Sequence, residues 1–231
     1  MNKFRLSSRL FSYVFWDSIL SNTDINDGKR EKLFLEISDL EKLRKKADYN
    51  TGSISNAAAW CLYCIVKYFY PKNIMEIGTF IGKSTWSMAK AQDDTLISDS
   101  YIVTCDFSND ITIPWSGKTK LKQYKKKSST DMLKQEEKFP DLILLDGRIQ
   151  KEDLILFETI ISKNTIILLD DFEGAEKGVI NYISLRKLKK LNNHFLIYPC
   201  ERSKLREFGE NSYSTTAVMF PNNLIELVPQ G

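Results

Sequence analysis

The chain has 231 residues, of which 42% are apolar, 27% are charged, 10 are glycine and 6 are proline. This composition excludes a disordered, collagen-like or low-complexity protein, and the length is that of one large domain with an added segment. The formal net charge of +3 is too small to indicate nucleic-acid binding.

The longest apolar stretch, residues 57–70, contains Lys67 and is shorter than the roughly 20 residues that cross a bilayer. We therefore expect no integral contact with a membrane. The four cysteines lie within apolar runs, which is typical of reduced, buried thiols. This pattern predicts a cytoplasmic protein.

The N-terminal part of the chain is predicted to be helical. Five apolar residues can share one helical face that must be buried against the chain's own domain or a second subunit: Phe4, Phe11, Val14, Phe15 and Ile19. Reversible contact with an anionic membrane is the alternative. Two further helices are expected over residues 30–46 and 54–69, because apolar residues recur there at helical spacing.

From residue 73 onward, short β-rich runs alternate with helical patterns, which is typical of a parallel sheet covered by helices on both faces. Strands are expected at residues 73–77, 101–106, 121–126, 142–146 and 165–170. Helices are expected at residues 83–92, 130–138, 151–162 and 178–191. Residues 195–199 and 214–220 are predicted to form a terminal antiparallel hairpin.

The most informative motif follows the first predicted strand. Glu76 precedes a Gly-x-x-x-Gly turn formed by Gly78 and Gly82, which leads into a helix near Ser84. Glycines let a ligand approach the backbone, and a helix N-terminus offers free N–H groups. The spacing departs from the G-x-G-x-x-G pattern, which disfavours NAD. The alternative is a tight turn without a ligand.

This motif resembles the first motif of the class I S-adenosylmethionine-dependent methyltransferases. Asp106 ends the next strand, where this family binds the two ribose hydroxyls. The resemblance spans about residues 54–220 and implies that S-adenosylmethionine (SAM) or its demethylated product (SAH) binds the turn. It also implies adenine contacts from the loop after the third strand. The implied cofactor-binding residues are Glu76, Gly78, Thr79, Gly82, Ser84, Asp106, Ser129 and Asp146.

Three acidic residues follow the fourth and fifth predicted strands. Asp146, Asp170 and Asp171 should meet at one sheet edge, where a hard divalent cation would relieve their repulsion. The arrangement resembles catechol O-methyltransferase, its bacterial relatives and the sugar methyltransferases of antibiotic pathways, which implies Mg²⁺ or a similar ion. The alternative is that Asp170 or Asp171 caps a helix and Asp146 only holds the amino group of the cofactor.

The general base is not evident from the sequence. In many of these relatives a histidine or lysine stands three residues after the acid of the fourth strand, whereas this chain has Ile149 there. Lys151 is the candidate if burial or a metal lowers its pKa, so Asp146 and Lys151 are the predicted catalytic residues. Otherwise the metal alone would acidify the acceptor hydroxyl, or the acceptor would bind in its ionised form.

Together these features predict a Rossmann-like α/β class I methyltransferase fold, with a seven-stranded, mostly parallel sheet whose last strand is antiparallel. Residues 1–53 are expected to form an N-terminal helical extension and residues 54–231 the SAM-binding domain. The predicted reaction is methyl transfer to a hydroxyl of a small molecule or sugar, with or without a divalent cation. The alternative is a cofactor-binding module without transfer activity. We expect no nucleic-acid partner, and a homodimer formed through the N-terminal helices is one of the two ways in which their apolar face can be buried.

Overall fold

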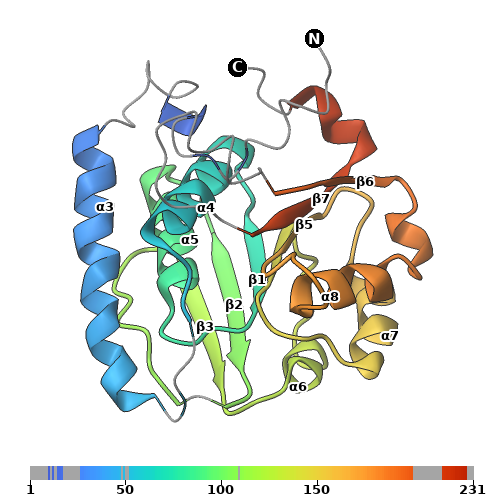
Figure 1. Ribbon diagram of the computed structural model, residues 1–231, viewed down its shortest axis with the longest axis horizontal. Helices are drawn as coiled ribbons and strands as arrows, with labels where there is room; N and C mark the ends of the chain where they lie inside the picture. Colours follow the sequence, from blue (N-terminus) through green and yellow to red (C-terminus); the bar gives the residue numbers. More distant parts are fainter. Residues whose placement is uncertain are drawn as a thin grey trace.

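Seven strands form a single sheet with helices on both faces (Figure 1). This computed structural model describes residues 10, 12, 15–17, 27–47, 49, 52–108, 110–199 and 215–227. Across the sheet the strand order is β3-β2-β1-β4-β5-β7-β6. The strands are β1 (Asn73–Ile77), β2 (Tyr101–Asp106), β3 (Lys120–Lys125), β4 (Leu142–Leu145), β5 (Ile166–Leu169), β6 (His194–Ile197) and β7 (Ala217–Pro221).

The strand directions confirm the predicted fold class. Strands β1 to β5 pair in parallel, whereas β7 is antiparallel to both of its neighbours, β5 and β6. The predicted bounds of β1 and β2 agree residue for residue with the structure. The C-terminal hairpin is also confirmed, with β7 lying between β5 and β6. Because the first five strands are parallel, their carboxyl ends all open on the same edge of the sheet.

Two layers of helices cover the sheet. One face carries α3 (Asp27–Asp39), α4 (Asn56–Phe69) and α5 (Lys83–Asp94), and the other carries α6 (Ser129–Leu133), α7 (Lys151–Ile160) and α8 (Lys177–Leu185). Between residue 27 and residue 227, the described part of the chain also contains the 3₁₀ segments η2 (Leu40–Lys46), η3 (Lys189–Leu191) and η4 (Asn222–Leu227). The predicted helix 178–191 therefore ends early, and the predicted helix 30–46 is split between α3 and η2.

Helix α6 is shorter than the sequence predicted. Ser128 and Asp131 form a capping box that begins it, and the helix ends at Leu133. The chain then turns inward, and the Glu136 carboxylate accepts hydrogen bonds from the hydroxyls of Tyr101 and Tyr124, each at 2.8 Å. A buried carboxylate needs such donors, so the end of the helix is set by contacts with β2 and β3.

Strand β4 illustrates how the sheet builds two cores. Leu142 and Leu144 point to the face covered by α3, α4 and α5, whereas Ile143 and Leu145 point to the face covered by α6, α7 and α8. All four side chains are buried. A continuous apolar run is what a strand buried on both faces requires, so β4 lies at the centre of the sheet.

Part of the N-terminal segment belongs to the same core as α4. Phe15 and Trp16 are buried, and the Trp16 indole N–H donates to the Leu10 carbonyl oxygen at 2.8 Å. The predicted positions Phe4, Phe11, Val14 and Ile19 lie outside the described residues, as does Cys200.

The domain division at residue 53 and the homodimer stay predictions. Within the part of the chain described, no helix has the length and apolar character that crossing a membrane requires.

Candidate active site

The chain turns tightly between β1 and α5. Gly78 has a φ of +100°, and a Cβ atom there would lie 2.7 Å from the backbone carbonyl carbon of Asp146. Gly82, with a φ of +80°, directly precedes α5. Both positions lie in the left-handed region that glycine adopts without strain. The turn after β1 therefore packs directly against the loop after β4, and Gly78 leaves its backbone open to a pocket.

Glu76 is completely buried beneath this turn. Its carboxylate accepts hydrogen bonds from the Ser84 and Thr85 hydroxyls of α5 and from the Thr104 hydroxyl of β2, the last at 2.7 Å. Burial raises the pKa of Glu76 to about 7, although the three hydroxyls lower it. Thr79 also bonds to Thr104. These predicted cofactor residues thus face the interior of the fold, where they hold the turn to α5 and β2.

Asp106 lies at the end of β2 and lines the pocket. Its Oδ2 accepts the Phe80 backbone N–H at 2.7 Å and the Tyr49 hydroxyl at 3.0 Å, and its Oδ1 accepts the Ser108 backbone N–H at 3.0 Å. The pKa of Tyr49 is raised above its usual value, mainly by burial and secondly by the nearby negative charge of Asp106. Uncharged donors therefore fix the orientation of this carboxylate.

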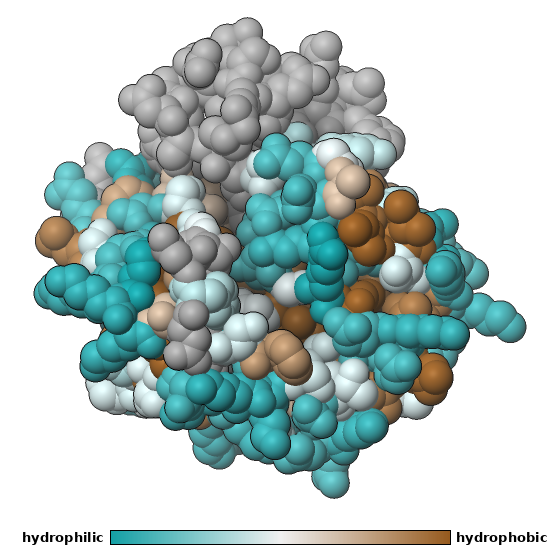
Figure 2. All heavy atoms as spheres, turned by 60° about the horizontal axis from the view of Figure 1, so that its bottom comes forward, coloured by the Kyte–Doolittle hydropathy of each residue, from teal (hydrophilic) through white to brown (hydrophobic). Residues whose placement is uncertain are grey.

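The pocket has a volume of about 530 Å³ and lies at the carboxyl ends of β1, β2 and β4. Figure 2 shows this edge of the molecule, whose surface is mostly hydrophilic with smaller apolar areas. The lining combines two glycines, two acids, hydroxyl groups and an aromatic ring: Gly78, Gly147, Asp106, Asp146, Ser128, Ser129, Thr130 and Phe107 are among its members. Such a mixed polar and apolar lining suits a nucleoside-sized ligand.

Ser129 lies at the first position of α6 and lines this pocket. Its hydroxyl donates to the buried Asp153 carboxylate at 2.5 Å, and Thr130 donates to the other oxygen of the same group at 2.5 Å. These bonds hold the start of α6 against α7. The structure thus brings Gly78, Asp106, Ser129 and Asp146 to one pocket, whereas Glu76 and Ser84 lie in the layer below it.

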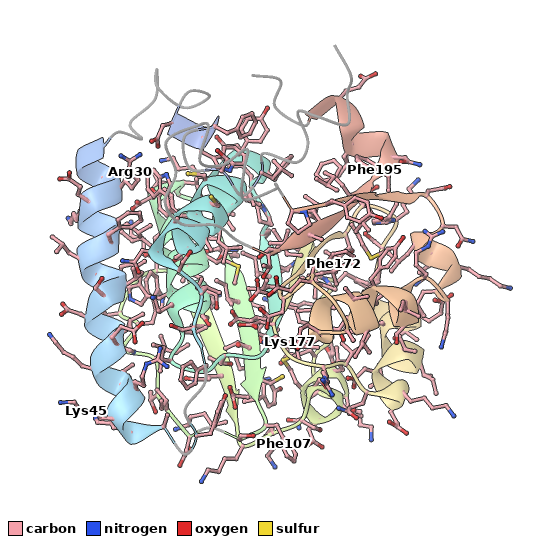
Figure 3. The ribbon with its side chains drawn as sticks, viewed as in Figure 1. Arg30, Lys45, Phe107, Phe172, Lys177 and Phe195 are labelled. Carbon is pink, nitrogen blue, oxygen red and sulfur yellow. The ribbon has the colours of Figure 1, made fainter. Side chains whose placement is uncertain are left out.

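The three acids at the ends of β4 and β5 converge as the sequence predicted. Each of Asp146, Asp170 and Asp171 places a carboxylate oxygen within 4.8 Å of the other two. Their compensating charge comes from Lys177, labelled in Figure 3, whose Nζ lies 2.5 Å from Asp146 Oδ1 and 3.1 Å from Asp171 Oδ2. Thr216 donates its hydroxyl to Asp170 Oδ1 at 2.6 Å.

The electrostatics of this cluster follow from burial and proximity. Burial, and then the neighbouring Asp170 charge, raises the pKa of Asp146 well above its ordinary value, and Lys177 only partly offsets this. Burial also raises the pKa of Asp170. For Lys177, burial lowers the pKa, but the attraction of Asp146 and Asp171 outweighs it and raises the pKa overall. Lys177 is therefore a fixed positive charge among the acids.

These contacts decide whether a divalent cation fits the residues as they are placed. The three carboxylates supply the hard oxygen ligands that Mg²⁺ prefers. However, the ammonium of Lys177 already bonds to both Asp146 and Asp171, and a divalent ion beside it would be repelled. In the described placement Lys177 is therefore the cation of this cluster, and an added divalent ion would fit only if Lys177 moved away from Asp146 and Asp171.

Sequence reasoning missed two residues of this edge. The predicted base, Lys151, is exposed at the start of α7 and does not line the pocket, whereas Lys177 of α8 contacts the acids directly. Tyr49, which bonds to Asp106, precedes α4 in a segment without a motif. The only sequence signal for Lys177 was its place at the start of a helix that follows two adjacent acids.

Comparisons with known proteins bear on the fold of this chain. No protein-family model matches the chain, and no curated protein matches it. An O-methyltransferase from Bacillus cereus, solved in complex with SAH, has 16% identity and a TM-score of 0.54 over 88% of this chain and 94% of its own. The chain has the fold of the class I methyltransferases.

Two further solved structures share this methyltransferase fold. The SAH-bound methyltransferase PaMTH1 from Podospora anserina has 16% identity and a TM-score of 0.53, over 88% of this chain and 92% of its own. The O-methyltransferase TomG from Streptomyces achromogenes, in complex with SAM and involved in tomaymycin synthesis, has 13% identity and a TM-score of 0.54, over 88% and 95%. The predicted resemblance is therefore confirmed for the fold.

Proposed function

We propose that this protein transfers the methyl group of SAM to a hydroxyl of a small molecule or sugar. One observation carries the proposal: in a chain with the methyltransferase fold, the oriented carboxylate of Asp106 and the Gly78 turn line the same pocket of about 530 Å³. Solved proteins of similar fold are bound to SAM or SAH. A small acceptor is favoured over a nucleic acid because the net charge is only +3.

Each part of the pocket would have a distinct role in binding SAM. Asp106 would accept hydrogen bonds from the two ribose hydroxyls, since a carboxylate offers two acceptor oxygens. Gly78 and Gly147 would allow the cofactor to lie against backbone, and Ser128 and Ser129 at the start of α6 would face the adenine. Asp146 borders both the pocket and the acid cluster, so the acceptor would meet the methyl group next to it.

The reaction is an in-line displacement at the methyl carbon. A lone pair of the acceptor oxygen forms the new O–C bond, the electrons of the C–S bond go to sulfur, and the hydroxyl proton is released to water. SAM thereby becomes the uncharged thioether SAH. The protein's contribution is to hold the oxygen and the methyl carbon close and in line, which supplies much of the rate enhancement in such reactions.

Assistance by a divalent cation is a second version of the same function. The convergence of Asp146, Asp170 and Asp171 favours it. It requires Lys177 to leave its two carboxylate partners, since the ammonium lies where the ion would bind. A cytoplasmic location, which fits the buried thiols of Cys64 and Cys105, belongs to the proposal as well.

Calorimetric titration with SAH tests the cofactor assignment. Asp106→Asn removes the charge of the carboxylate and should weaken SAH binding roughly 30- to 100-fold, since two charge-assisted hydrogen bonds are lost. Asp110→Asn is the matched control, because Asp110 is exposed and pairs with Lys125 at 3.5 Å. Equal SAH affinity in the wild type and Asp106→Asn, or no binding by the wild type, would reject the assignment.

Transfer itself is tested with isotopically labelled SAM. The protein is incubated with labelled SAM and a metabolite extract, and the labelled product is isolated. A labelled ether of a small molecule is expected. Binding of SAH without any labelled product across extracts would identify a cofactor-binding module in place of an enzyme.

A further inference from the structure

Lys177 connects the acids of two neighbouring strands. Its Nζ contacts Asp146, which follows β4, and Asp171, which follows β5. The lysine side chain is 27% exposed and that of Asp146 18% exposed, so the pair is shielded from much of the solvent. A charge pair in this environment is screened less than one on the open surface.

The packing of α8 fixes the position of this lysine. The next residue is Gly178, and a Cβ atom there would lie 2.3 Å from the Asp170 carbonyl oxygen. One turn further along the same face, the buried Asn181 donates to the Gly147 carbonyl oxygen at 2.8 Å and accepts the Ile149 N–H at 3.1 Å. Helix α8 is thus docked on the loops after both strands.

The charge and donor count of the ammonium define what it can do. Lys177 has three N–H donors, of which Asp146 and Asp171 use two, and the structure gives it no third partner among the described residues. We propose that the ammonium of Lys177 takes the place of a divalent cation at this sheet edge and offers its third N–H to one oxygen of the acceptor. The part that concerns the acceptor rests on the proposed function.

This inference also narrows the class of acceptor. A divalent cation with open coordination positions can bind two neighbouring oxygens of one substrate. One free N–H donor binds a single oxygen. Lys177 would therefore contact one oxygen of the acceptor, so this contact does not require a second oxygen beside the reactive hydroxyl and requires no added metal.

Binding of Mn²⁺ alone tests the inference without an acceptor or SAM. Titration followed by electron paramagnetic resonance should show no stoichiometric site in the wild type below about 1 mM, the weak end of protein cation sites. Lys177→Met keeps the aliphatic stem but removes the charge, so it should bind one Mn²⁺ at least tenfold more tightly than the wild type. Lys187→Ala is the control, because Lys187 is exposed beyond the far end of α8.

Two results would overturn the inference. One is a wild-type protein that binds one Mn²⁺ as tightly as Lys177→Met. The other is a Lys177→Met protein that retains the wild-type circular dichroism spectrum but gains no Mn²⁺ binding. If Lys177→Met does not fold, thermal unfolding of the wild type decides: a melting temperature unchanged by 1 mM Mn²⁺ supports the inference, and an increase contradicts it. SAH titration of the same samples reports separately on the proposed function.

Discussion

The carboxyl edge of the sheet has two halves, one at β1 and β2 and one at β4 and β5, and their acidic residues are stabilised by different kinds of group. At β1 and β2, Glu76 and Asp106 are surrounded by uncharged donors, namely hydroxyls and backbone N–H groups. At β4 and β5, Asp146 and Asp171 are compensated by the full charge of Lys177. Both halves consist of parallel strands with the same topology. The difference therefore comes from the side chains that neighbouring elements direct to the edge.

This contrast indicates that the two halves bind different groups of a ligand. Neutral donors orient a carboxylate without cancelling its charge, so Asp106 can still attract the hydroxyls of a ligand. An ammonium cancels charge and adds a donor, so the β4–β5 half can bind an oxygen of the acceptor. One half is arranged to accept hydrogen bonds and the other to donate one.

The largest effect on stability is expected at Gly78, where the turn after β1 contacts the loop after β4. Gly78→Ala would place a Cβ atom 2.7 Å from the backbone of Asp146 at a φ of +100°. The combined clash and backbone strain should lower the free energy of unfolding by about 3 kcal/mol or more, measured by urea denaturation. Gly174→Ala separates the two causes, because Gly174 has a φ of +55° but no atom within 4 Å of its Cβ position. A loss of about 1 kcal/mol is expected there. Equal losses in both variants would show that the halves are not in tight contact.

The buried acid of the β1–β2 half should give the next largest effect. The pKa of Glu76 is raised from 4.5 to about 7, so the folded protein holds this proton more tightly than the unfolded chain. The stability that this group contributes is complete at low pH and is lost as the pH rises through 7, by about 2 kcal/mol between pH 5 and pH 8. Glu76→Gln should reduce the pH dependence of the free energy of unfolding by this amount, as measured in urea denaturation series. Glu152→Gln, at an exposed position, should retain it, and an unchanged slope in Glu76→Gln would refute the raised pKa.

The smallest effect is expected from removing the Tyr49 hydroxyl, which donates a hydrogen bond to Asp106. Tyr49 donates to Asp106 Oδ2 at 3.0 Å, and its ring packs on Phe80 with centroids 5.3 Å apart. Tyr49→Phe keeps the ring and frees the oxygen, so SAH affinity should rise by up to about fivefold, which corresponds to less than 1 kcal/mol. Tyr70→Phe, at an exposed site, should leave the affinity unchanged. A tenfold loss of affinity in Tyr49→Phe would mean that this hydroxyl contacts the cofactor directly.

Local signals explain what the sequence could predict. The bounds of β1 follow from a short apolar run that ends at Gly78, and the convergence of Asp146 with Asp170 follows from the common edge of parallel strands. Lys177 could not be predicted in the same way. Its direction depends on Gly178 letting α8 approach the Asp170 backbone, a contact that no local pattern encodes. The end of α6 was missed for a similar reason, because it depends on two tyrosines from other strands.

The position of β7 between β5 and β6 determines when the sheet can be completed during synthesis of the chain. All five residues of β7 are buried, and among the described residues β6 joins the sheet only by pairing with β7. During synthesis on the ribosome, β6 therefore has no strand to pair with until residue 221 has emerged. Until then the exposed edge of β5 is open to pairing with other chains. The sheet is therefore completed only near the end of synthesis. A chain that stops before β7 would be a substrate for chaperones or proteases.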